Sequence, residues 1–266
     1  MSTPRWPRCR ARANARPSAP KTSKLSGGDT PGPDRPLRQD TAAIGRMFSG
    51  LAPAYRRFNR FSSLGLDGLW RRAVVKTLRG ATDALDIGTG TGDLAWLLKD
   101  ERRSGGRVVG LDLSDEMLAR AAQAGRGASP EWVRGGADGL PFSDRSFDAV
   151  TSAYVMRNLW VGGVLEASLR EAARVLRPGG WLVFLDLTRP ANPVLRFGHS
   201  LYNRTVVPLV GRILFGARWP GDYLKTSIEA LPSVDVLRGF FEAAGFTQFE
   251  CRPLWGGIVS LFIGRR

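Results

Sequence analysis

The stretch LDIGTGTGD, residues Leu85–Asp93, decides the fold. A short apolar run leads into three glycines at alternate positions, Gly88, Gly90 and Gly92, and a helical pattern begins at Asp93. Glycine lets a ligand approach the backbone and lets the chain adopt positive φ angles. A tight turn alone would explain the glycines, but the step from strand to helix favours a ligand-binding loop.

Apolar strands and amphipathic helices alternate along the rest of the chain. We expect strands at Ala84–Gly88, Arg107–Leu113, 131–135, Phe147–Ala153 and Trp181–Leu187, and helices at Asp93–Lys99, Asp115–Ala124, Gly163–Leu176 and Val234–Ala244. Such alternation predicts a doubly wound, Rossmann-like α/β sheet. The last two strands, Phe246–Cys251 and Gly257–Ile263, are too close for a helical crossover and should pair antiparallel. The sequence therefore predicts a seven-stranded sheet, mostly parallel, with an antiparallel C-terminal hairpin.

Residues 1–44 differ in composition from the rest of the chain. Residues 1–40 contain nine Arg or Lys and three Asp, with abundant Pro, Ser and Gly and no apolar period. Such a segment buries too little surface to offset the entropy of ordering, so we expect a disordered basic tail. A plain tail, or a start codon assigned upstream of Met47, fits better than a transit peptide. From Gly45 the pattern predicts two or three short N-terminal helices, interrupted by Pro53 and Gly65.

The composition limits the function classes. The net charge of +15 favours contact with anionic membrane surfaces, whereas a nucleic-acid role is disfavoured because a basic excess is usually a solvated surface. Two distant cysteines, Cys9 and Cys251, and one histidine, His199, argue against a zinc site, and we expect no metal. No apolar run reaches the roughly 18 residues of a membrane span. We expect a cytoplasmic protein with peripheral contact at the inner face of the cell membrane.

The ligand of the glycine loop follows from its acidic residues. A dinucleotide loop needs a small residue where Asp93 stands, since a carboxylate there would repel a pyrophosphate at the helix N-terminus. S-adenosyl-L-methionine has no phosphate and carries an ammonium and a sulfonium group, so an acidic glycine-rich loop suits it. We therefore assign Asp86 and Thr91, together with the three glycines, to this cofactor.

Further cofactor contacts are expected at the ends of the next strands. Asp112 ends the second strand, 20 residues after Gly92, where a carboxylate can accept both ribose hydroxyls. It could instead be an exposed turn residue, since Ser-Asp-Glu follows shortly after it. The remaining candidates lie beside these strand ends: Leu113, Ala137, Asp138 and Ala153. Asp138 is equally well explained as a turn residue.

Several motifs together resemble one family. LDIGTGTGD, GLDLSDEML, ADGLPF, MRNL and RVLRPGG have the order and spacing of the ubiquinone/menaquinone biosynthesis C-methyltransferases. MFSGLAPAYRRFNRFSSLGLDGLWRR resembles the N-terminal helices of that family, and DYLKTSIEALPSVDVLRGFFEAAGF with GGIVSLFIG resembles its C-terminal signature. The resemblance implies that residues 45–266 form a class I S-adenosylmethionine-dependent methyltransferase domain with an N-terminal helical lid.

The resemblance also implies a reaction. The acceptor would be a polyprenyl quinol, a hydroquinone whose ring carbon attacks the sulfonium methyl after a ring hydroxyl has lost its proton. Arg157 would stabilise the phenolate, Asn158 would orient a hydroxyl or a water, and Tyr55 would close over the site. From the residues alone, Arg157 could equally form a surface salt bridge. Another lipophilic acceptor and a non-catalytic S-adenosylmethionine-binding role remain alternatives, and a homodimer is compatible with the sequence.

The chain departs from the family pattern at four positions. Arg56 and Arg60 stand where the family commonly has Asp, Gly136 stands for Asp or Asn, and Ala153 stands for Ser. The first two departures concern the expected lid. A further amphipathic stretch, Leu201–Trp219, has two interpretations: a lid that touches lipid, or an ordinary packed helix.

Overall fold

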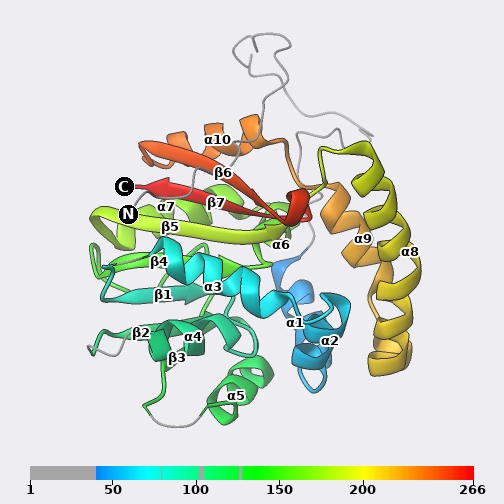
Figure 1. Ribbon diagram of the computed structural model, residues 1–266. Helices are drawn as coiled ribbons and strands as arrows, with labels where there is room; N and C mark the ends of the chain where they lie inside the picture. The colour runs from blue at the N-terminus through cyan, green and yellow to red at the C-terminus, as the bar shows by residue number, and fades with distance from the viewer. Residues whose placement is uncertain (1–39, 79, 102–104, 126–127) are drawn as a thin grey trace, which may run out of the picture.

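The computed structural model describes residues 40–78, 80–101, 105–125 and 128–266 (Figure 1). The expected disordered tail lies, up to residue 39, outside the described residues. Within the described ranges seven strands form one sheet in the order β3-β2-β1-β4-β5-β7-β6. The parallel strands are β1 (Ala84–Ile87), β2 (Val108–Asp112), β3 (Glu131–Arg134), β4 (Phe147–Ala153) and β5 (Leu176–Leu187), and the antiparallel ones are β6 (Gln248–Leu254) and β7 (Val259–Arg265). The predicted mixed sheet is confirmed.

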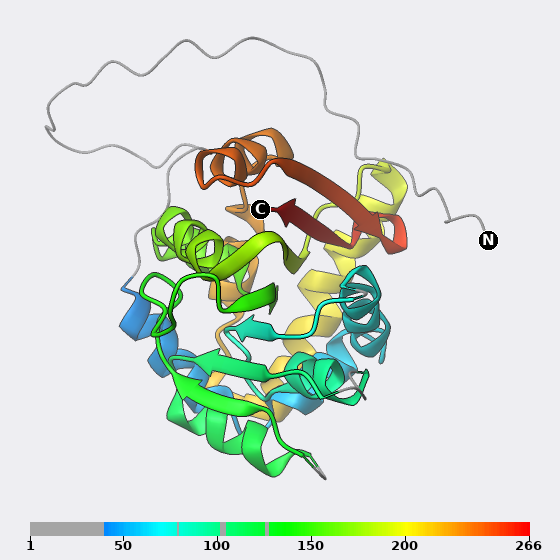
Figure 2. The same cartoon turned by 90° about the vertical axis from the view of Figure 1, so that its left-hand side faces the viewer.

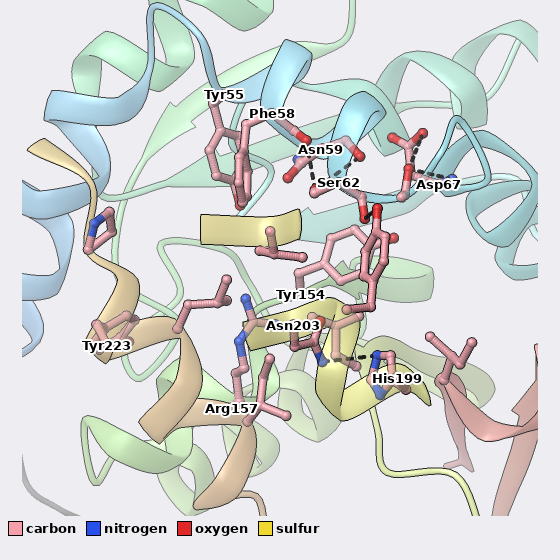
Figure 3. Close-up of a pocket in the computed structure, with 18 of the residues that line it drawn as sticks. Tyr55, Phe58, Asn59, Ser62, Asp67, Tyr154, Arg157, His199, Asn203 and Tyr223 are labelled. Atoms are coloured by element: carbon pink, nitrogen blue, oxygen red, sulfur yellow. Dashed lines mark hydrogen bonds between the residues drawn. The ribbon is translucent and has the colours of Figure 1, made fainter. Parts of the chain in front are cut away.

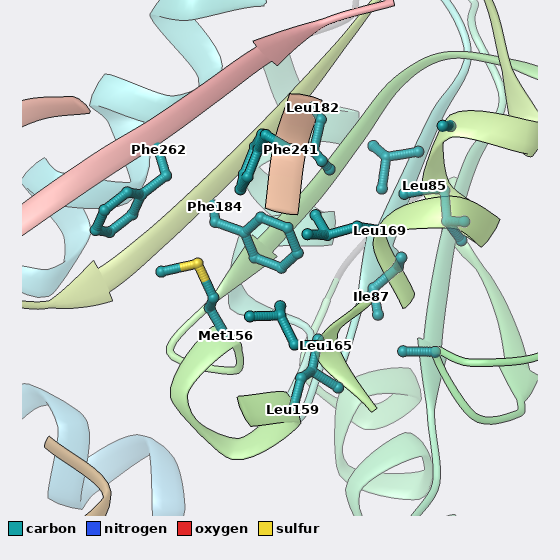
Figure 4. Close-up of a cluster of buried hydrophobic side chains, with 14 of the residues drawn as sticks. Leu85, Ile87, Met156, Leu159, Leu165, Leu169, Leu182, Phe184, Phe241 and Phe262 are labelled. Carbon is teal, nitrogen blue, oxygen red and sulfur yellow. The ribbon is translucent and has the colours of Figure 1, made fainter. Parts of the chain in front are cut away.

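Helices cover both faces of the sheet (Figures 1 and 2). On one face lie α3 (Asp67–Thr77) and α4 (Asp93–Glu101), and on the other lie α7 (Leu165–Val175) and α10 (Val234–Ala243). Figure 4 shows the second face, where Leu169 of α7 and Phe241 of α10 pack on Leu85 and Phe184 of the strands. A parallel sheet buried on both sides requires continuous apolar strands, which explains the strand VVGL in the sequence.

The strand order reverses at β1, which lies between β2 and β4. In open α/β sheets, ligands bind at this switch point, outside the carboxyl ends of the strands. The helices gathered at that end are α1 (Thr41–Leu51), α2 (Tyr55–Ser62), α6 (Met156–Val161), α8 (Pro193–Phe215) and α9 (Gly221–Glu229) (Figure 1). Most of the helices that do not cover a face of the sheet are therefore gathered around the expected site.

Several predicted boundaries were wrong. The first helix begins at Thr41, where the Asp40 side chain accepts a hydrogen bond from the amide of Ala42, so ordered structure starts before Gly45. The fifth strand was expected to begin at Trp181, but it begins at Leu176, so the RPGG motif lies inside β5, with a register shift against β4. Gly179 has a φ of +74°, which allows this irregularity without strain on a side chain. The helix α5 (Asp115–Gln123) begins where it was predicted, and the Ser114 side chain caps it by accepting a hydrogen bond from the Met117 amide.

The amphipathic stretch belongs, up to Phe215, to one longer helix, α8, of 23 residues. The Asn192 side chain caps its start by accepting hydrogen bonds from the amides of Val194 and Leu195. Leu209 and Ile213 remain 59% and 72% exposed, so the packed-helix interpretation is wrong for the outer face of α8. Among the described helices, α8 included, none combines the length and apolarity that crossing a membrane requires.

Candidate active site

Two cavities meet at the carboxyl edge of the sheet. The glycine-loop cavity, about 120 Å³, is bounded by the β1–α4 loop, the end of β2 and the helices α1 and α2. The helical cavity, about 310 Å³, is bounded mainly by α2, α8 and α9 and is lined mostly by apolar side chains. Both cavities are lined by the same four residues where they adjoin: Phe48, Tyr55, Asn59 and Tyr154. The arrangement provides a polar site and an apolar site side by side.

The three glycines of the loop have different structural roles. Gly88, Gly90 and Gly92 all have positive φ angles, of +62°, +55° and +77°. Gly88 and Gly90 line the glycine-loop cavity, and a Cβ on Gly88 would lie 2.6 Å from Val155. Gly92 does not line it; a Cβ there would lie 2.7 Å from the Trp132 ring. Gly92 therefore lets the loop pack against β3 rather than lining the cavity.

Asp86 is a buried acid at the end of β1. Its carboxylate accepts hydrogen bonds from the Thr89 hydroxyl at 2.7 Å and from the Thr151 hydroxyl at 2.9 Å. Burial raises the pKa of Asp86 to about 7, although both hydrogen bonds act in the opposite direction. A cation in the adjoining cavity would favour the ionised form, so this acid suits the ammonium group of S-adenosylmethionine.

Asp112 connects the glycine loop to β2. One oxygen accepts from the Gly90 amide at 2.8 Å, and the other accepts from the Ser114 amide at 2.9 Å. Burial raises the pKa of Asp112, although these hydrogen bonds act in the opposite direction. Since a carboxylate oxygen has two lone pairs, each can still accept a ribose hydroxyl. Leu113 beside it lines the same cavity and is partly exposed.

The other predicted cofactor residues do not all reach the cavity. Ala137 and Ala153 line it, as does Thr91, whose hydroxyl donates to the Asp93 carboxylate at 2.6 Å. Asp138 is exposed and lies outside the lining, which favours its interpretation as a turn residue. The Asp138 carboxylate lies close to Gly136, one of the departures from the family pattern, and a Cβ at position 136 would lie 2.7 Å from its Oδ1.

The N-terminal helix α2 covers the junction of the cavities. Tyr55 packs edge-on against Phe48, with ring centroids 5.8 Å apart. Arg56, one of the departures, forms an ion pair with Asp93, with Nε and Oδ1 2.6 Å apart, and donates to the Thr91 carbonyl at 3.4 Å. Arg60, the other departure, is exposed. The arginine at position 56 thus ties α2 directly to the glycine loop.

Arg157 is buried at the start of α6 and faces the helical cavity (Figure 3). Its Nη1 donates to Oδ1 of Asp186 at 2.6 Å, and its amide donates to Oδ2 at 3.1 Å. Arg157 therefore forms a buried ion pair rather than a surface salt bridge. Asp186 was not singled out in the sequence, where the only signal is one acid in the apolar strand WLVFLDL.

Asn158 lines the glycine-loop cavity and is held from two sides. Its Nδ2 donates to the Tyr154 carbonyl at 3.3 Å, and its Oδ1 accepts from the Tyr223 hydroxyl at 3.0 Å. Tyr223, on α9, also lines the helical cavity and was missed in the sequence. Its contact links α9 to the predicted catalytic Arg-Asn pair.

The sheet order, the glycine loop and the acids at the ends of β1 and β2 together define a class I S-adenosylmethionine-dependent methyltransferase. Solved methyltransferase structures share this fold. One from Thermotoga maritima has a TM-score of 0.59 at 20% identity, over 84% of this chain and 99% of that one. Another, from Mesorhizobium loti, has a TM-score of 0.53 at 23% identity, over 76% and 100%. At these identities the likeness concerns the fold alone.

The chain belongs to the ubiE/COQ5 methyltransferase family, whose profile matches residues 37–266. It is 39% identical to a demethylmenaquinone methyltransferase of Thermus thermophilus, over 83% of this chain and all of that protein. It is 32% identical to a ubiquinone/menaquinone biosynthesis C-methyltransferase UbiE of Hahella chejuensis, over 86% and 93%. The resemblance found in the sequence is confirmed, and the chain is an S-adenosylmethionine-dependent methyltransferase.

Proposed function

We propose that this enzyme methylates a ring carbon of a polyprenyl quinol of the demethylmenaquinol type. The observation that carries the proposal is the position of Arg157, a buried arginine on the wall of a mostly apolar cavity that adjoins the glycine-loop cavity. The apolar walls suit a prenylated ring, and the names of the relatives agree with such a substrate.

The residues divide the work between the two cavities. The methyl group comes from S-adenosylmethionine, whose sulfonium makes it electrophilic. Asp86 and Asp112 would hold the ammonium and ribose groups in the glycine-loop cavity. Arg157 would stabilise the phenolate that activates the ring carbon, and Asn158, fixed by Tyr223, would orient the ring hydroxyl. Covering the junction, Tyr55 would exclude water and align the reactants.

The proposal is tested by a methylation assay on a short-chain demethylmenaquinol under reducing conditions, with cofactor binding measured in parallel. We expect a product heavier by one methyl group on carbon. In a strain lacking the gene, the demethylated quinone should accumulate. Reintroducing the cloned gene should restore the methylated quinone. If the protein binds S-adenosylmethionine but leaves the quinol unchanged, the acceptor is a different lipophilic molecule.

Cofactor binding should depend on the ionisation of Asp86. Because its pKa is raised to about 7, the side chain is mostly neutral below that pH and does not attract an ammonium group. We expect the Kd for S-adenosylmethionine to rise by up to about tenfold for each pH unit below 7. Calorimetry between pH 5.5 and 7.5 measures this. In Asp86→Asn, binding should be weak and nearly independent of pH; a wild-type Kd that does not change with pH would contradict the assignment.

We further propose that the outer face of α8 contacts an anionic bilayer at the cytoplasmic side of the membrane. Two exposed arginines, Arg204 and Arg212, lie on this face. It also exposes five large apolar side chains: Val194, Phe197, Leu201, Leu209 and Ile213. The inner face of the same helix lines the helical cavity through His199, Tyr202 and other residues. An apolar face with arginines suits lipid headgroups and acyl chains, and a prenyl tail could enter the cavity from there.

The double substitution Phe197→Ser with Ile213→Ser should weaken binding to phosphatidylglycerol vesicles by about tenfold or more, because two large apolar contacts are lost. Vesicle sedimentation measures this, and wild-type binding should also fall at high salt. Turnover of a water-soluble short-chain acceptor should stay at the wild-type rate. Equal wild-type affinity for neutral and anionic vesicles would contradict the proposed surface.

A further inference from the structure

Five buried side-chain polar atoms have no hydrogen-bond partner among the described residues. They are Asn59 Nδ2, Trp70 Nε1, Arg71 Nε, Tyr154 Oη and Arg157 Nε. Every one of these residues lines the glycine-loop cavity or the helical cavity. Buried polar atoms are nearly always paired within folded proteins, so unpaired donors concentrated on cavity walls point to groups of a bound ligand.

Tyr154 is the most unusual of these residues. It follows β4 directly, its φ of +64° lies in the left-handed region, and its side chain is buried. For a bulky residue this conformation is strained, and such strain persists mainly at functional sites. The backbone is held by a hydrogen bond from the Tyr154 amide to the Leu185 carbonyl at 2.7 Å. The fold thus keeps a strained residue that lines both cavities where they adjoin and whose buried hydroxyl has no partner among the described residues.

The surroundings of Tyr154 keep its hydroxyl protonated. Burial raises its pKa well above the usual value, although the Arg71 guanidinium, 5.3 Å from the ring centroid, acts in the opposite direction. Trp70, in the same apolar cluster, lines the helical cavity, and its buried indole N–H has no partner among the described residues. A tyrosine hydroxyl both donates and accepts, whereas the indole only donates. Together they suit a neutral oxygen, such as a phenol or a quinone carbonyl.

We propose that Tyr154, with Trp70, binds the second oxygen of a 1,4-dioxygenated aromatic ring, the oxygen remote from the carbon that is methylated. The inference rests on the proposed function. Arg157 would take the oxygen beside that carbon, through its unpartnered Nε (Figure 3). The opposite oxygen then needs a partner in a wall that is otherwise largely apolar, and Tyr154 supplies it. A site built to hydrogen-bond a hydroxyl rejects an analogue that lacks it, so this contact selects quinols over simple phenols.

Two acceptors that differ in one oxygen test the proposal. The first is a 1,4-naphthalenediol with a short prenyl group; the second is the matched 1-naphthol that keeps only the hydroxyl beside the unsubstituted carbon. For wild type we expect kcat/KM to be higher for the diol by about tenfold or more. Tyr154→Phe should lower the diol value by about tenfold and the naphthol value by less than about twofold, which removes the preference. Cofactor affinity, measured by calorimetry, should not change.

Tyr223→Phe is the matched control, because its hydroxyl lines the same cavity but already donates to Asn158. It should affect both acceptors equally and leave their ratio unchanged. Equal losses for both acceptors in Tyr154→Phe, or no loss for either, would overturn the proposal. So would weaker cofactor binding, since Tyr154 also lines the glycine-loop cavity.

A binding measurement separates this proposal from the proposed function. Tryptophan fluorescence quenching gives the Kd of each ring compound without turnover. If wild type binds the diol more tightly than the naphthol and Tyr154→Phe does not, the oxygen contact stands even where no methyl group is transferred. If wild type binds both equally, the contact is overturned even where methylation occurs.

Discussion

Arg157→Lys is expected to reduce turnover of demethylmenaquinol on the order of a hundredfold or more, nearly as much as Arg157→Ala. A lysine cannot reproduce the planar guanidinium, which donates to Asp186 through Nη1 while its Nε remains unpartnered among the described residues. Loss of one preorganised charged donor to a developing oxyanion typically has an effect of this size. Steady-state kinetics under reducing conditions measure it.

Two controls define the role of Arg157. Cofactor affinity should hardly change in Arg157→Lys, since Arg157 lines the helical cavity and not the glycine-loop cavity. Arg170→Lys, on an exposed arginine of α7, should keep the wild-type turnover. Wild-type turnover in Arg157→Ala would remove the residue from the mechanism.

The sheet and the glycine loop could be predicted because their signals are local. A strand such as β1 is a continuous apolar run, and the alternating glycines after it mark a loop whose conformation most other residues cannot adopt. The two antiparallel strands followed from the shortness of their connection. The expected fifth strand left out the RPGG segment because Pro and Gly are typical of turns, while pairing with β4 keeps this segment in the sheet as an irregularity.

Other parts of the site depend on contacts between distant residues, which a single sequence does not show. Asp186 lies 29 residues from Arg157, and nothing local announces their pairing. The six-residue helix α6 is too short for a helical period to be recognised, although it carries the Arg-Asn pair. Tyr154 adopts its positive φ because the strands around it fix the backbone.

The arginine at position 56, where the family commonly has an aspartate, shows how a departure from a family pattern can fit its neighbours in the fold. In isolation, Arg56 in place of a common Asp suggests a damaged lid. In the fold, it pairs with Asp93 of the glycine loop at 2.6 Å, where an aspartate would meet a like charge. Helix α2 is therefore tied to the loop by a contact that suits this chain. A departure from a family pattern at one position is best judged together with the residues that this position contacts.

Asp186→Ala is expected to lower the free energy of unfolding by about 3–5 kcal/mol and to abolish most turnover. The side chains of the Arg157–Asp186 pair are only 5% and 0% exposed, so removal of the acid leaves an uncompensated buried charge. Urea unfolding followed by circular dichroism measures the change. As a control, Glu166→Ala removes one partner of the exposed Glu166–Arg170 pair and should cost less than about 0.5 kcal/mol.

A double substitution separates the stability of the buried pair from its function. Replacing both partners by apolar residues, Arg157→Met with Asp186→Leu, removes both buried charges together and should recover most of the lost stability. Turnover should stay absent, since the guanidinium is gone, while S-adenosylmethionine should still bind. A protein stabilised in this way but inactive would show that the ion pair is kept for positioning Arg157 rather than for folding. Recovered turnover, or an Asp186→Ala protein as stable and active as wild type, would contradict that role.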